Sequence, residues 1–76
     1  MPAKKSAQIQ ALGRAISDTR HERGMPQEAF ARHAGLDRSY FGAVERGEFN
    51  LTITTLLKIA TGLDVPASSL LERAKL

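Results

Sequence analysis

Apolar residues recur at intervals of three and four positions in five stretches of the chain. This spacing places the apolar residues of each stretch on one face of an α-helix. It predicts helices over about 7–23, 26–34, 38–46, 53–61 and 67–75, with short connections between them. Because short helices must bury their apolar faces against one another, the pattern predicts an all-α fold, a compact five-helix domain.

Glycine, proline and capping residues support these boundaries. Gly24 follows a basic last turn, which is the common position of glycine after a helix. Pro26 is accepted at the start of a helix, where its missing N–H has no partner in any case. Asp37 is suited to cap the third helix, and Gly47 and Gly62 are expected to end the third and fourth helices.

Length and charge narrow the class of protein. The chain has 76 residues, no Cys and a formal net charge of +3. It contains no apolar run near the ~18 residues of a membrane span, so we expect a cytoplasmic protein without membrane contact. Residues 1–6 are expected to form a disordered basic tail and residues 7–76 a single domain. The charge favours a polyanionic partner only weakly, because a small positive charge also serves solubility.

The segment 24–47 predicts two short helices joined by a tight turn at Gly35. Inward-facing Phe41 and Val44 leave an outward face on the second helix, with Tyr40 on its flank; this face comprises Arg38, Ser39, Gly42 and Ala43. In such a pair the first residues of the second helix meet base edges in the DNA major groove. An arginine there donates two hydrogen bonds to guanine, and an alanine methyl can meet a thymine methyl. The alternative is an ordinary solvated helix face.

Residues 9–71 resemble the Xre family, the phage-repressor and Cro-like helix-turn-helix regulators with a lambda-repressor-like domain. The matching positions are Arg20, Gly24, QEAFA (27–31), GL (35–36), Phe41, Val44, ERG (45–47) and TLLKIATGL (55–63). Within that family, the LDRSY, ERG and NLTI segments are similar to restriction–modification controller proteins, which are small homodimers.

The resemblance implies roles for further residues. Gln27 would bind a DNA phosphate at the start of the second helix, and Arg46 and Asn50 would flank the DNA backbone. Arg20 and Glu45 would form an ion pair between the first and third helices.

The chain departs from the family pattern at three positions. Pro26 stands where a Ser or Thr cap is common, and Glu48 and Phe49 lie in a loop that frequently carries basic residues. Because Glu48 would repel phosphate, this loop is an alternative site of contact with a partner subunit. For Phe49, a local packing contact is favoured over a wedge into DNA.

These features predict a sequence-specific transcriptional regulator that binds double-stranded DNA as a homodimer on a pseudo-palindromic operator. The dimer surface is expected on the fifth helix and the end of the fourth, at Val65, Leu70 and Leu71. Because Leu70 and Leu71 are adjacent, one is expected to pack within its own subunit. The other, with Val65 or Leu76, would meet the partner.

Two other classes of protein are alternatives to the regulator. An antitoxin or protein-interaction module could use the same fold to hold a partner protein. An enzyme is disfavoured because His21 and His33 lie in different predicted helices without an acidic cluster around them. We therefore expect no catalytic residue, no metal, no cofactor and no small-molecule ligand.

Overall fold

The computed structural model describes residues 6–76, and all regular structure in this range is helical. The helices are α1 (Ala7–Glu22), α2 (Gln27–Ala34), α3 (Arg38–Glu45), α4 (Ile53–Leu63) and α5 (Ala67–Arg73). The prediction of an all-α, five-helix domain is therefore confirmed. Within the described residues, none of the helices combines the length and apolar character of a membrane span.

The start of α1 corrects one predicted boundary. The predicted basic tail falls on residues 1–5, which lie outside the described residues, and on Ser6. Ser6 does not belong to a tail, because its hydroxyl accepts hydrogen bonds from the backbone of Gln8 at 3.1 Å and Ile9 at 3.3 Å. A side-chain oxygen in this position satisfies N–H groups that have no partner inside the helix. Ser6 is thus the N-cap of α1.

The end of α4 corrects a second predicted boundary. Gly62 was expected to end this helix, but α4 continues to Leu63 and ends at Asp64, which has a left-handed φ of 59°. A Cβ atom at Gly62 would lie 3.0 Å from the ring of Phe30. The glycine therefore serves the close packing of α4 on α2, and Leu63 beyond it is completely buried.

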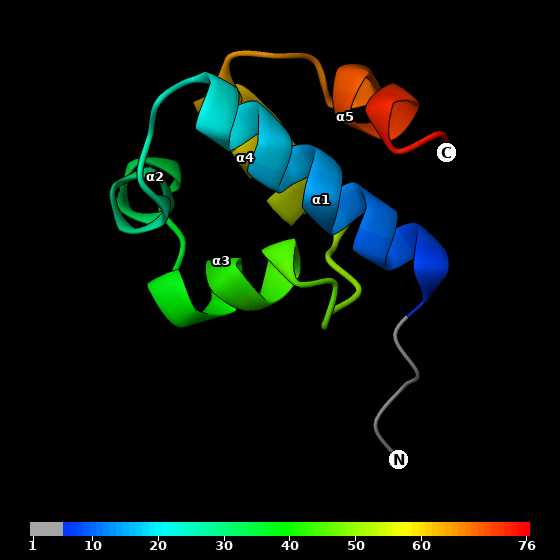
Figure 1. Cartoon of the computed structure of the whole chain (residues 1–76). Coiled ribbons are helices and arrows are strands. Elements are labelled where there is room, and N and C mark those ends of the chain that lie inside the picture. The colour runs from blue at the N-terminus through cyan, green and yellow to red at the C-terminus, as the bar shows by residue number, and fades with distance from the viewer. Residues whose placement is uncertain (1–5) are drawn as a thin grey trace.

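The core forms where α1 meets α3, α4 and α5, and where α2 packs on α3 and α4. In Figure 1, α1 crosses the middle of the molecule, with α3 on one side and α5 on the other, and α1 contacts α3, α4 and α5. The largest fully buried side chains are Phe30, Phe41, Ile16, Ile59, Leu63, Leu70 and Val44. The rings of Phe30 and Phe41 lie 5.0 Å apart, so α2 and α3 share one aromatic contact in the core.

Gly13 allows α1 to lie directly on the end of α3. A Cβ atom at this position would come within 2.5 Å of the Val44 carbonyl oxygen and 2.6 Å of the Glu45 carbonyl oxygen. A glycine inside a helix costs about 1 kcal/mol relative to alanine. The close approach of two backbones accounts for its presence here, and it fixes α3 against the longest helix.

An ion pair ties the last helix to the first. Arg73 on α5 donates to both carboxylate oxygens of Glu22 on α1, at 2.9 and 2.5 Å. The hydrogen bonds with Arg73 lower the pKa of Glu22, and the same hydrogen bonds raise the pKa of Arg73. Because both groups are exposed, the pair orients α5 more than it stabilises the fold.

Candidate nucleic-acid interface

The first turn of α3 projects from the surface. Arg38 and Ser39 are exposed, and Tyr40 is half-buried. The Asp37 carboxylate caps the helix by accepting a hydrogen bond from the Tyr40 backbone at 3.1 Å. The predicted Asp37 cap is therefore present, and Arg38 and Ser39 face outward as predicted.

The middle of α3 differs from the prediction. Gly42 and Ala43 were expected to face outward, but both are buried, and Ala43 is only 5% exposed. The side-chain ends of Arg46 and Gln27 lie over Gly42, and the buried stretch of α3 extends over four consecutive residues from Phe41 to Val44. The prediction that the Ala43 methyl is presented to DNA is therefore wrong.

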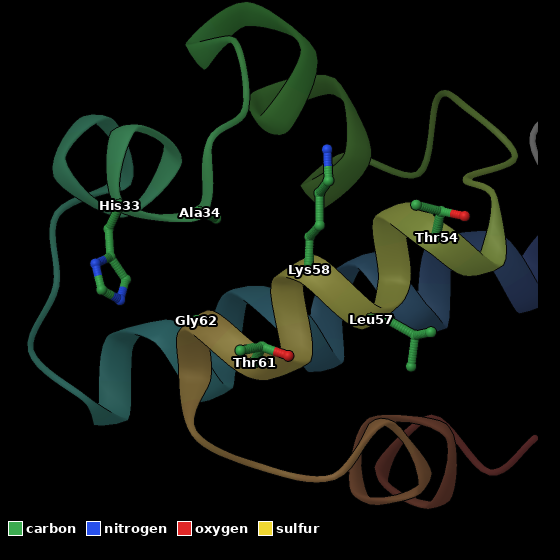
Figure 2. A pocket seen from close by; sticks show the side chains of 7 residues that line it. All are labelled: His33, Ala34, Thr54, Leu57, Lys58, Thr61 and Gly62. Atoms are coloured by element: carbon green, nitrogen blue, oxygen red, sulfur yellow. The ribbon is translucent and has the colours of Figure 1, made fainter.

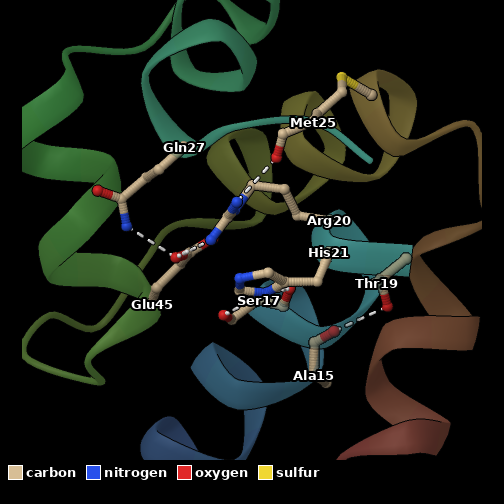
Figure 3. Close-up of polar contacts among 8 residues, drawn as sticks. All are labelled: Ala15, Ser17, Thr19, Arg20, His21, Met25, Gln27 and Glu45. Atoms are coloured by element: carbon tan, nitrogen blue, oxygen red, sulfur yellow. Dashed lines mark hydrogen bonds and ion pairs between the residues drawn. The ribbon is translucent and has the colours of Figure 1, made fainter. Parts of the chain in front are cut away.

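A buried ion pair joins α1 to the end of α3. The Nε of Arg20 donates to Oε2 of Glu45 at 2.6 Å and Nη2 donates to Oε1 at 3.1 Å, while Nη1 donates to the Met25 carbonyl at 2.8 Å. The two side chains are 7% and 6% exposed. Figure 3 shows the guanidinium group between the Met25 carbonyl and the carboxylate. The predicted ion pair is thus present.

The same carboxylate holds the first residue of α2. The Gln27 amide nitrogen donates to Oε1 of Glu45 at 2.8 Å (Figure 3). The sequence did not predict this contact, which depends on how α2 closes on α3. An amide nitrogen carries two N–H donors, and this contact uses one of them. Arg20, Glu45 and Gln27 thereby fix the relative positions of three helix ends.

The loop after α3 contacts two of the outward side chains. Arg46 donates to the Glu48 carboxylate from Nε at 2.9 Å and from Nη2 at 3.3 Å, and these hydrogen bonds raise the pKa of Arg46. The ring of Phe49 lies 5.8 Å from that of Tyr40, centroid to centroid. The local packing contact predicted for Phe49 is therefore confirmed. Asn50 is exposed beyond it.

Large exposed apolar side chains lie on α4, at the C-terminus and, with Phe49 50% exposed, in the loop after α3. Ile53, Leu57 and Leu76 are 70%, 52% and 50% exposed. Of the residues predicted at a dimer surface, Val65 and Leu71 are half-buried, whereas Leu70 is completely buried in the core of its own subunit. The assignment of Leu70 to the dimer surface is wrong, and Leu71 is the member of the pair that remains accessible.

The spacing of apolar residues in the sequence could have indicated that Ile53 and Leu57 lie outside the buried face of α4. α4 buries Leu56, Ile59, Ala60 and Leu63 on one face. Ile53 and Leu57 are four residues apart and form a second apolar stripe beside that face. A helix with more apolar residues than its own domain can cover has a surface left for another contact.

A comparison with known protein families matches the core of this chain. The family model described as "Helix-turn-helix" matches residues 16–70, which include α2, the turn at Gly35 and α3. This chain belongs to the helix-turn-helix family. Within the matched range, α2 and α3 are the two helices on either side of the turn at Gly35.

The similar proteins are regulators and controller proteins. A "hypothetical transcription factor" of Neisseria meningitidis is 44% identical over 61 residues, covering 75% of this chain; the chain spans 58% of that protein's length. The crystal structure of the restriction-modification controller protein C.AhdI from Aeromonas hydrophila is 40% identical, with a TM-score of 0.83 over 86% of this chain and 98% of that one. The controller protein C.Esp1396I, solved as a tetramer with its natural 35 base-pair operator, is 36% identical, with a TM-score of 0.84 over 92% of each chain.

An open groove lies between α2 and α4. Its volume is about 410 Å³, and it is lined by His33, Ala34, Thr54, Leu57, Lys58, Thr61 and Gly62 (Figure 2). None of these seven residues is among the predicted DNA contacts. The other histidine, His21, contacts the Ser17 carbonyl at 2.8 Å on α1. Over the described residues, no three His, Cys, Asp or Glu side chains cluster so that they could hold a metal ion.

Proposed function

We propose that this protein is a sequence-specific DNA-binding transcriptional regulator of the restriction–modification controller type. It acts in the cytoplasm as a homodimer on a pseudo-palindromic operator and is not an enzyme. The observation that carries the proposal is the exposed first turn of α3, set on a helix whose next four residues are buried. A recognition helix needs such an arrangement, because its first residues enter the groove while its middle anchors it to the domain.

Base recognition is assigned to the exposed turn. Arg38 donates two hydrogen bonds to a guanine, a contact worth about 1–3 kcal/mol of discrimination. Ser39 donates or accepts at a neighbouring base edge. Tyr40 offers a ring and a hydroxyl, and the contact of its ring with Phe49 limits the directions in which it can turn.

Positioning on the DNA backbone is assigned to three residues around that turn. Gln27 lies at the N-terminus of α2, where backbone N–H groups attract a phosphate. Arg46 and Asn50 are exposed after the end of α3. Contacts of this kind set the register of the protein on the duplex, and they carry no base sequence themselves.

The dimer is assigned to a surface that we term the α4–α5 apolar face, made of Ile53, Leu57, Leu71 and Leu76. α4 and α5 pack against each other, and Leu57 points from α4 toward α5 in Figure 2. One recognition helix reads too few base pairs to select a single operator. Two copies related by a two-fold axis read two half-sites about 34 Å apart.

Salt dependence tests DNA binding most simply. Fluorescence anisotropy with a labelled duplex should show that log affinity falls linearly with log salt concentration, with a slope of about 0.9 per neutralised phosphate. This electrostatic term separates a DNA reader from a module that binds only a partner protein. A flat response, or no binding to any duplex at low salt, would end the proposal.

Sedimentation tests the dimer. Leu57→Asp places a charge on the α4–α5 apolar face at a position that is already 52% exposed, so the monomer fold should survive. Analytical ultracentrifugation should show a monomer for this variant and a dimer for Leu57→Met, which keeps the apolar volume. Circular dichroism checks that both variants are folded. An unchanged dimer for Leu57→Asp would contradict the interface.

A further inference from the structure

Glu48, an acidic residue, is paired with Arg46, to which the proposed function assigns a contact with the DNA backbone. The Glu48 carboxylate accepts two hydrogen bonds from the Arg46 guanidinium group, at 2.9 and 3.3 Å. A guanidinium group binds a carboxylate and a phosphate with the same two-pronged geometry. Glu48 therefore holds Arg46 in the way that a backbone phosphate would hold it.

The backbone keeps Glu48 in this position. Its N–H donates to the Ala43 carbonyl at 3.0 Å, and the N–H of Gly47 donates to the Val44 carbonyl at 3.0 Å. Gly47 is buried, with a left-handed φ of 73°, and a Cβ atom there would lie 2.6 Å from the Cα of Gln10. The loop is thus fixed to the end of α3 and to α1, and Glu48 is placed beside Arg46 by the fold.

We propose that Glu48 is an intramolecular competitor of DNA phosphate for Arg46, and that it lowers the affinity of the protein for any duplex. The proposal rests on the DNA-binding function above. Before Arg46 can neutralise a phosphate, its two hydrogen bonds to Glu48 must break, and the Glu48 charge then repels the same phosphate. The consequence falls on the sequence-independent part of binding, which phosphate contacts dominate. Glu48 would thus limit the time that the regulator spends on DNA without an operator.

The test measures nonspecific binding of Glu48→Gln over a range of salt concentrations. We expect this variant to bind a random-sequence duplex about two- to fivefold more tightly than wild type, the range that exposed ion pairs support. Its salt slope should steepen by about 0.9 for each subunit. In wild type, the Glu48 carboxylate that Arg46 leaves takes up a cation, which offsets the cation released from the DNA, and the variant has no such carboxylate.

Matched variants separate this effect from a change in net charge. Asp18→Asn removes one negative charge from the side of α1 that faces α5, where Asp18 lines a hollow with Arg14 and Arg73. It should change affinity less than Glu48→Gln does. In an Arg46→Ala background, Glu48→Gln should have a smaller effect than in the wild-type background, because only the direct repulsion between Glu48 and the phosphate is then removed.

Three results would overturn the proposal. The first is that Glu48→Gln binds the random-sequence duplex no more tightly than Asp18→Asn does. The second is that Glu48→Gln binds it more weakly than wild type, which would mean that Glu48 helps Arg46 to bind DNA. The third is an equal effect of Glu48→Gln with and without Arg46.

A measurement without DNA separates this inference from the proposed function. The Nε–H resonance of Arg46 in the free protein should shift, and should exchange faster with water, in Glu48→Gln. If wild type binds no duplex while this resonance responds as expected, the DNA-binding function fails and the competition fails with it, although the ion pair stands. An unchanged resonance would overturn the inference alone.

Discussion

At the scale of single residues, the family pattern predicted the partners of the buried charges but not their full surroundings. The Arg20–Glu45 pair could be inferred because both positions match the pattern. The hydrogen bond from Gln27 to Glu45 could not, because it depends on the rotation of α2 against α3. The burial of Ala43 was also missed, because it depends on the packing around α3 and not on helical spacing.

The buried charges make a stability prediction. Glu45→Gln keeps the shape of the side chain but leaves the Arg20 charge without its counter-ion. Because breaking a buried pair leaves an uncompensated charge, the free energy of unfolding should fall by about 3–5 kcal/mol. Urea denaturation measures this loss. The control is Glu72→Gln on the exposed face of α5, which should change the free energy of unfolding by less than about 0.5 kcal/mol. Equal effects of the two variants would contradict the role of the pair.

At the level of the helices, Gly13 and Gly42 lie against different kinds of atoms, which the sequence alone does not distinguish. Gly13 lets the backbone of α1 touch the backbone carbonyls at the end of α3. Gly42 lies beneath side-chain ends: a Cβ atom there would be 3.2 Å from Nη1 of Arg46 and 3.4 Å from Oε1 of Gln27. Backbone atoms cannot yield without separating the helices, whereas the ends of long side chains can.

The two glycines should therefore respond differently to alanine. Gly13→Ala should lower the free energy of unfolding by about 1–3 kcal/mol, because the core is overpacked. Gly42→Ala should leave stability unchanged or raise it by up to about 1 kcal/mol, the gain in helix propensity. It should weaken DNA binding, because Gln27 and Arg46 must move. Thermal melts and anisotropy titrations of both variants check this, and loss of stability without loss of binding in Gly42→Ala would contradict it.

At the scale of the whole molecule, the sequence predicted the five helices and the exposed turn of α3, because helical spacing and capping residues are local signals. The surface that would join two copies was predicted less well. Leu70 is in the core, and Ile53 and Leu57 are exposed instead. The packing of α4 against α5 and α1 decides which apolar residues are buried. The spacing of apolar residues along the sequence does not determine this packing.

In the proposed function, the exposed turn of α3 reads DNA sequence through Arg38, and an Arg38 variant examines this step. An operator can be selected from a random pool of duplexes with the wild-type protein. The affinities of wild type and Arg38→Ala are then measured on that operator and on a scrambled duplex at one salt concentration. Loss of a two-pronged contact to guanine should cost about 1–3 kcal/mol on the operator alone, which lowers the ratio of specific to nonspecific affinity by about 5- to 150-fold. An unchanged ratio of specific to nonspecific affinity would show that Arg38 does not read base sequence.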